Sequence, residues 1–203
     1  MRFILSAILI VSSLQAMAAD PKADPHAGHQ MDPKMMEMMK VMQQAGTPGE
    51  QHKMLAGYAG NWTYTGKMWH KPDQAPQETS GTAKFEMVLD GRWLKQEFKG
   101  EMMGQPFTGL GYLGYNNATK EYETSFMDTM STGSMHGKGS YDKSKKTIAE
   151  SGQYYCPIKK GMREYRGEWK FVDKNTMMYT MYGTGMEDQP EFKQMELNYK
   201  RSR

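Results

Sequence analysis

The chain has 203 residues, enough for one domain of ordinary size, and its formal net charge of +3 is nearly balanced. Lys and Arg alternate with Asp and Glu along the chain, and only Lys200-Arg201-Ser202-Arg203 is a basic run, which argues against nucleic-acid binding. A single cysteine, Cys156, means that no internal disulfide can form. Methionine, with 22 residues, is far above its ordinary usage.

Residues 1–18 have the pattern of a secretory signal peptide. Arg2 gives a positive start, residues 3–14 are mostly apolar, and Ala16-Met17-Ala18 supplies small residues before a cleavage point. This apolar run is too short for a membrane span, and no other long apolar run follows it. We therefore expect a protein that is exported to the bacterial periplasm and has no membrane span.

Residues 19–46 are predicted to form a flexible tether and then a methionine-rich helix. Asp32-Pro33 is typical of a helix start, and several methionines recur at the spacing of one helical face. Thioether and imidazole groups together suit Cu(I). One hypothesis is therefore copper binding by His26, His29, Met31, Met35, Met38, Met39 and Met42. The alternative is that the methionine face packs against the following domain.

A second, short helix is predicted to start at Thr47-Pro48-Gly49-Glu50, with Thr47 and Glu50 forming a capping box. His52 lies on this helix. It is either a structural residue that bonds to a rim loop or an acid, base or haem ligand. The structural role is favoured because no carboxylate or thiol partner for His52 is set by the sequence.

From Asn61 onward the apolar residues follow the period of two that is typical of strands. Predicted strands cover residues 61–69, 82–89, 92–101, 107–115, 122–127, 134–141, 147–154, 165–171, 177–182 and 192–199. Asp90-Gly91 predicts a tight hairpin. About ten strands are too many for a flat open sheet of this size, and closure removes exposed edges. The domain at 47–203 is therefore predicted to be all-β, a single antiparallel barrel with a short capping helix.

The two ends of this predicted barrel resemble those of the calycins, the lipocalin-type barrels. Gly60-Asn61-Trp62 opens the first strand after a short helix, and Tyr199-Lys200-Arg201 ends the last strand. In calycins a Gly-x-Trp on the first strand packs under a basic side chain from the end of the last. The resemblance implies a cation–π contact of Trp62 with Arg201 or Lys200 that closes the barrel.

The chain is also similar to DUF1579, a bacterial family of unknown function. The segments that carry the similarity are Pro48-Gly49-Glu50-Gln51-His52 with Leu55, Gly60-Asn61-Trp62, Met68-Trp69, Met103–Gly109, Gly114–Asn116, Asp128–Thr132 and Met195–Arg201. Together they span nearly the whole domain, so the resemblance implies one barrel-like domain, without an established activity. The methionine- and histidine-rich segment before Thr47 lies largely outside it.

Six aromatic residues are candidates to line a pocket for an apolar ligand: Trp69, Trp93, Tyr112, Phe126, Tyr165 and Trp169. A barrel core needs such residues in any case, and the sequence leaves open whether the lumen is filled or hollow. The leading expectation is a non-catalytic periplasmic barrel that binds a small apolar molecule.

Catalysis has weaker support in the sequence. Asp128, Ser131 and His136 are the residue types of a hydrolase triad, but no Gly-x-Ser-x-Gly elbow surrounds the serine, so coincidence is favoured. No phosphate loop and no Cys/His metal site of fixed spacing is present in the sequence. A haem- or isomerase-type barrel that uses His52 or His136 is the enzyme alternative.

Overall fold

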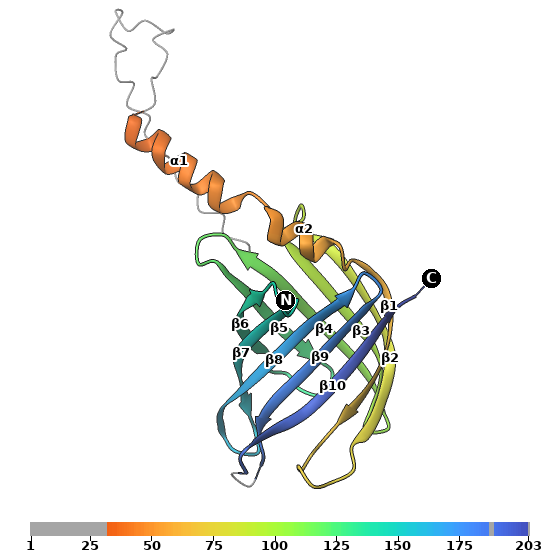
Figure 1. Cartoon of the computed structure of the whole chain (residues 1–203). Helices are drawn as coiled ribbons and strands as arrows, with labels where there is room; N and C mark the ends of the chain where they lie inside the picture. The colour runs from red at the N-terminus through yellow and green to blue at the C-terminus, as the bar shows by residue number, and fades with distance from the viewer. Residues whose placement is uncertain (1–31, 187–188, 203) are drawn as a thin grey trace, which may run out of the picture. The chain divides into compact units, whose positions relative to one another are not determined.

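The protein is described by a computed structural model over residues 32–186 and 189–202, and Figure 1 shows its barrel. Its elements are α1 (Pro33–Gly46), α2 (Glu50–Ala56), β1 (Gly60–Met68), β2 (Gln77–Val88), β3 (Trp93–Met102), β4 (Gln105–Asn116), β5 (Glu121–Asp128), β6 (Met135–Asp142), β7 (Thr147–Cys156), β8 (Gly161–Asp173), β9 (Thr176–Thr184) and β10 (Glu191–Arg201). Each strand pairs antiparallel with its neighbours in the chain, and β1 pairs with β10. The predicted closed antiparallel barrel is therefore confirmed.

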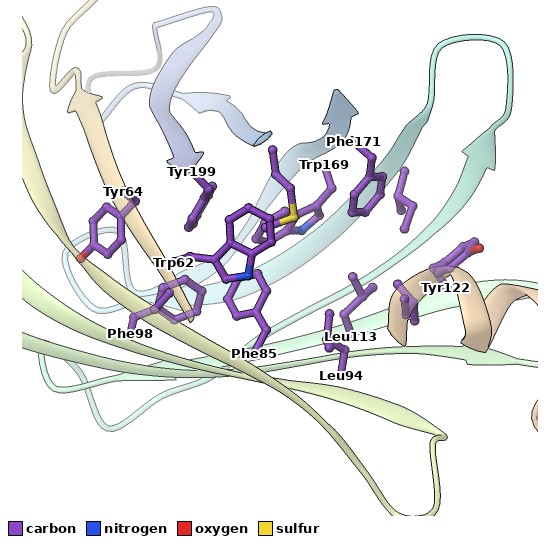
Figure 2. Packing of buried hydrophobic residues seen from close by; sticks show 14 of the residues in the cluster. Trp62, Tyr64, Phe85, Leu94, Phe98, Leu113, Tyr122, Trp169, Phe171 and Tyr199 are labelled. Atoms are coloured by element: carbon purple, nitrogen blue, oxygen red, sulfur yellow. The ribbon is translucent and has the colours of Figure 1, made fainter. Parts of the chain in front are cut away.

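Alternation of side chains divides each strand into an inward and an outward face. In β8 the inward residues from Arg163 to Phe171 are buried, while the residues between them are exposed or partly exposed. Figure 2 shows the aromatic residues that strands from opposite sides of the barrel direct into its core. One such cluster contains Trp62, Phe85 and Trp169, with Phe85 lying 6.2 Å and 6.3 Å from the two indole rings.

Helix α2 lies across one end of the barrel (Figure 1) and closes it. Leu55 on this helix has no exposed surface, and the ring of Tyr58, just after it, lies 4.4 Å from that of Phe171. The half of the lumen next to α2 is thus filled with apolar side chains. Among the helices in the described part of the chain, none is long and apolar enough to cross a membrane.

The start of α2 differs from the prediction. Its N-cap is Gly49, and Nδ1 of His52 accepts a hydrogen bond from the Gly49 N–H at 3.0 Å. Thr47 instead donates its hydroxyl to the Gln43 carbonyl at 2.6 Å. The predicted capping box of Thr47 and Glu50 is therefore wrong, because the threonine side chain is already bonded to the last turn of α1.

The first hairpin of the barrel is also longer than expected. Val88 pairs with Trp93, so a four-residue loop, not the two residues Asp90-Gly91 alone, joins β2 to β3. Leu89, predicted to be the last residue of this strand, has a φ of 52° and is exposed. Arg92 holds the loop in this form because its Nη1 donates to the Leu89 carbonyl at 3.1 Å.

The seam between the first and last strands is fixed by one arginine. Arg201 lies opposite Trp62 in register, and its guanidinium carbon is 4.3 Å from the centre of a Trp62 ring. Its three nitrogens donate to the backbone carbonyls of Gly57, Ala59 and Lys174 at 2.9, 2.6 and 2.8 Å. Arg201, and not Lys200, is therefore the cation at this position, and it joins the last strand to the segment between α2 and β1.

Candidate ligand-binding site

The half of the barrel remote from α2 contains an interior cavity of about 180 Å³. Its lining comes from most of the strands and reaches the strand ends farthest from α2. Five of the lining residues are methionines: Met68, Met102, Met135, Met181 and Met195. Aromatic rings make up most of the rest of the apolar wall. The barrel is therefore filled at one end and hollow at the other.

Four of the six aromatic residues predicted to line a pocket border this cavity, and they are Tyr112, Phe126, Tyr165 and Trp169. Of these, Tyr112 lies between the inward residues Gly111 and Leu113, so its side chain is on the outer face of β4. The structure does not place Trp69 or Trp93 there. Trp93 precedes the inward residue Leu94, so it lies on the outer face, where its ring packs over Gly114. Trp69 follows the last residue of β1, and the Lys193 ammonium lies 4.6 Å from its ring centre.

A row of small residues leaves room for Tyr165 against the barrel wall. Thr124, Gly137, Gly152 and Tyr165 are neighbours across β5, β6, β7 and β8. A Cβ atom on Gly152 would lie 2.6 Å from the Tyr165 ring, and one on Gly137 would lie 2.6 Å from its hydroxyl oxygen. The ring can lie across both strands only because these two residues have no side chain.

Glu150 is a buried carboxyl group in the cavity wall and was not among the predicted site residues. Only 6% of the residue is exposed. Its Oε1 accepts a hydrogen bond from the Tyr179 hydroxyl at 3.1 Å, whereas its Oε2 is buried without a hydrogen-bond partner in the described part of the chain. Burial raises the pKa of Glu150, and the Tyr179 hydroxyl, which donates to its Oε1, opposes this shift in part.

Two hydroxyl groups of the same cavity are also buried without a hydrogen-bond partner within residues 32–186 and 189–202: Thr124 Oγ1 and Tyr199 Oη. Apart from Glu150, the described residues of the lining include one more carboxyl group, that of Asp128, which is partly exposed. No Lys, Arg or His side chain belongs to the described lining. The cavity is thus largely apolar, with a few unpaired polar atoms and an acidic character.

The raised pKa of Glu150 gives a stability prediction. The folded chain holds the proton of Glu150 more tightly than the unfolded chain, so stability is highest below the unfolded pKa of about 4.3 and falls as the pH rises through the folded pKa. Glu150→Gln keeps an acceptor for Tyr179 and removes this titration. We expect the variant to lack the fall and to be more stable than wild type at neutral pH. Urea unfolding between about pH 4 and pH 8 measures this.

Glu164→Gln is the matched control for Glu150→Gln, because Glu164 is an exposed residue of the neighbouring strand β8. Its stability should follow that of wild type over the same pH range. A Glu150→Gln variant whose stability falls as steeply as that of wild type would show that the buried carboxyl does not contribute to the pH dependence.

The histidines discussed as catalytic candidates are bonded locally. His52 is buried, its ring packs edge-on against that of Tyr115, and its Nδ1 accepts a hydrogen bond from the Gly49 N–H. Burial lowers the pKa of His52. A neutral ring is required at this position, because Nδ1 accepts a hydrogen bond. His52 therefore joins the start of α2 to β4.

The structure does not bring Asp128, Ser131 and His136 together. His136 is exposed on β6, and its Nε2 lies 2.8 Å from the hydroxyl oxygen of Ser134. The side chains of Asp128 and Ser131 each accept a hydrogen bond from a backbone N–H two residues further along the chain. Cys156, at the end of β7, is buried and unpaired.

The candidate copper ligands fall into two groups. His26, His29 and Met31 lie outside the described residues. The others belong to α1, and each is more than half exposed: Met35, Met38, Met39 and Met42. Within the described ranges, no group of three or more His, Cys, Asp and Glu residues could hold a metal ion. Copper binding stays a prediction.

Comparisons with known proteins agree on the fold. The sequence model of a family described as "Protein of unknown function (DUF1579)" matches residues 47–201. The crystal structure of Rv2717c from M. tuberculosis is similar with a TM-score of 0.58 and 16% identity, over 77% of this chain and 100% of that chain. An S-type phycobiliprotein lyase, CPES from Guillardia theta, is similar with a TM-score of 0.54 and 8% identity, over 75% and 93% of the two chains. Comparison with curated proteins finds no match.

Proposed function

Because the chain belongs to DUF1579, a family described only as proteins of unknown function, we propose from the barrel itself that this protein binds a small, largely apolar molecule in its interior cavity, without catalysis. The observation that carries the proposal is the hollow half of the lumen. Aromatic and methionine side chains line it, while the other half is filled. Apolar cavities with a few polar groups are the usual sites for small molecules.

The volume of the cavity limits the size of the ligand. At about 180 Å³ it is close to the roughly 150 Å³ of an apolar cavity that binds benzene, and below the roughly 300 Å³ at which drug-sized sites begin. We therefore propose a ligand with a single ring or a short chain. The five lining methionines support some variety of shape, because their unbranched side chains adapt to irregular surfaces.

The proposed place of action is the bacterial periplasm. This proposal depends on the signal-peptide pattern of residues 1–18, which lie outside the described structure.

Filling the cavity tests the proposed function. Met68 lines the cavity and Lys67, its neighbour on β1, is exposed, so Met68→Trp and Lys67→Trp place the same side chain on opposite faces of one strand. The ¹³C-methyl NMR signals of the lining methionines should shift when ethylbenzene is added to wild type and to Lys67→Trp. We expect Met68→Trp to reduce the affinity at least about tenfold. Equal affinities of the two variants would contradict an interior site.

Copper binding is a second candidate function, supported by the exposure of four methionines on α1, where their thioethers are accessible. Replacing Met35, Met38, Met39 and Met42 by leucine should lower the Cu(I) stoichiometry in a titration against a competing chelator. Replacing the exposed Met103 and Met130 in the same way is the control, and should leave the stoichiometry unchanged. A stoichiometry that is the same in both variants would remove the candidate.

A further inference from the structure

The interior cavity has carboxyl groups in its described lining but no basic side chain, and its buried carboxyl, that of Glu150, has no ion-pair partner among the described residues. Glu150 and Asp128 belong to its lining, and the described lining residues include no basic side chain. No basic residue in the described part of the chain forms an ion pair with Glu150, although the residue is only 6% exposed. A buried carboxylate is costly unless it is paired, so a cation that entered the cavity would stabilise the charged form of Glu150.

The geometry around Glu150 leaves one oxygen for such a cation. Oε1 is bonded to the Tyr179 hydroxyl at 3.1 Å, and Oε2 is buried without a partner among the described residues. Gly167, directly opposite on β8, leaves the space for this pair, because a Cβ atom there would lie 2.5 Å from Oε1 and 2.7 Å from the Tyr179 oxygen. The carboxyl group is thus held in place by one bond, and its second oxygen is buried without a hydrogen-bond partner among the described residues.

The remaining wall of the cavity also suits a cation with an apolar body. The rings of Phe98 and Phe126 lie 5.7 Å apart in the lining, and that of Trp169 lies 5.8 Å from that of Tyr199. Aromatic faces attract cations as well as apolar groups. A ligand without a charge would use the rings and methionines but leave Oε2 unpaired.

We propose that the ligand is a small apolar amine whose ammonium group pairs with the Glu150 carboxyl group, with its body among the aromatic and methionine side chains of the cavity. This inference rests on the proposed function of interior ligand binding and adds the chemical class of the ligand. No bond is formed or broken, and the ammonium supplies the positive charge that the described lining lacks.

The test compares two probes of equal size and different charge. Benzylamine and ethylbenzene have the same number of non-hydrogen atoms, and only benzylamine carries an ammonium group. Their affinities for the full chain are measured from the ¹³C-methyl signals of the cavity methionines, with the exposed methionines of α1 as internal reference. We expect benzylamine to bind about ten- to hundredfold more tightly, the range of a charge-assisted hydrogen bond.

Two variants assign the preference to one carboxyl group. Glu150→Gln should bind the two probes about equally, whereas Asp128→Asn should keep the preference, because Asp128 is partly exposed and its Oδ1 already accepts from the Met130 N–H at 2.8 Å. Glu150→Gln is expected to be folded and stable at neutral pH. A loss of its preference for benzylamine would therefore report a change in binding and not a loss of folding.

The outcomes distinguish the two proposals. Equal affinities of wild type for benzylamine and ethylbenzene, or a preference that persists in Glu150→Gln, would overturn the amine inference and leave interior binding intact. Failure of both probes to bind wild type would overturn interior binding of small molecules, and the amine inference with it. The comparison in wild type needs no variant, so the test stands even if a variant does not fold.

Discussion

Replacing Trp62 by alanine is expected to destabilise the protein by about 3–5 kcal/mol, the range for truncating a fully buried large aromatic residue. Trp62 has no exposed surface, and its Nε1 donates to the Tyr58 carbonyl at 3.1 Å. Its ring also supports the Arg201 guanidinium at the seam. The substitution therefore leaves a cavity and an unpaired carbonyl, and it weakens the closure of the barrel. Urea unfolding followed by far-UV circular dichroism measures the loss.

Trp69→Ala is the matched control for Trp62→Ala. Trp69 also carries a cation over its ring, Lys193 at 4.6 Å, but it is only partly buried, just beyond the end of β1. We expect its loss to cost about 1 kcal/mol or less. Similar losses for the two tryptophans would show that Trp62 has no special part in closing the barrel.

Gly152→Ala is expected to cost about 1–3 kcal/mol, a large effect for the addition of one methyl group. The new Cβ would lie 2.6 Å from the Tyr165 ring and would also meet the backbone carbonyl of His136. The ring can move only toward the lumen, so the variant should have a smaller cavity as well as a lower stability. Urea unfolding measures the loss of stability, and the affinity for ethylbenzene reports on the smaller cavity.

Two further variants assign the effect of Gly152→Ala to the clash. Gly161→Ala should be nearly neutral, because the nearest atom to a Cβ there is the Lys159 carbonyl oxygen at 3.9 Å. Tyr165→Leu should recover part of the loss when it is combined with Gly152→Ala, since the shorter side chain removes one of the two contacts. Strictly additive losses in the double variant would contradict a clash between these residues.

The closed barrel could be predicted from the sequence because the alternation of side chains is local and repeated. In the segment from Tyr165 to Phe171, every second residue is apolar or small, and the structure buries those residues. The contact between Trp62 and Arg201 followed from a resemblance to known barrels. It could not follow from alternation alone, because its two residues belong to opposite ends of the domain.

The hollow half of the lumen could not be predicted in the same way. Whether an inward residue packs against α2 or borders the cavity depends on its position along the barrel axis. That position follows from the strand lengths and registers, which could not be predicted from the sequence. Trp93 illustrates a second point, because it directly precedes the inward residue Leu94, and alternation therefore places it on the outer face of β3. Aromatic residues are suited to a pocket, but two further properties decide which of them line it. These are the face of the strand on which the residue lies and its distance along the barrel from α2.

The inward position of Glu150 could be predicted from the sequence more easily. It lies two residues after Ile148 in β7, so the period of two places both on the inward face, and a carboxyl on that face is unusual. Ser151 and Gly152 weaken the alternation of β7, which makes its two faces hard to assign from the sequence. An acidic residue in phase with buried apolar neighbours is the signal that could have identified it.

The pairing of the first strand with the last has a consequence for how this protein is made. The bond from Arg201 to the Ala59 carbonyl joins residues 142 positions apart, so β1 has an unpaired edge until the ribosome has delivered nearly the whole domain. Contacts of such long sequence separation form slowly, and an open strand edge can pair with other chains in the meantime. Newly synthesised copies are therefore expected to depend on protection from aggregation until Arg201 emerges.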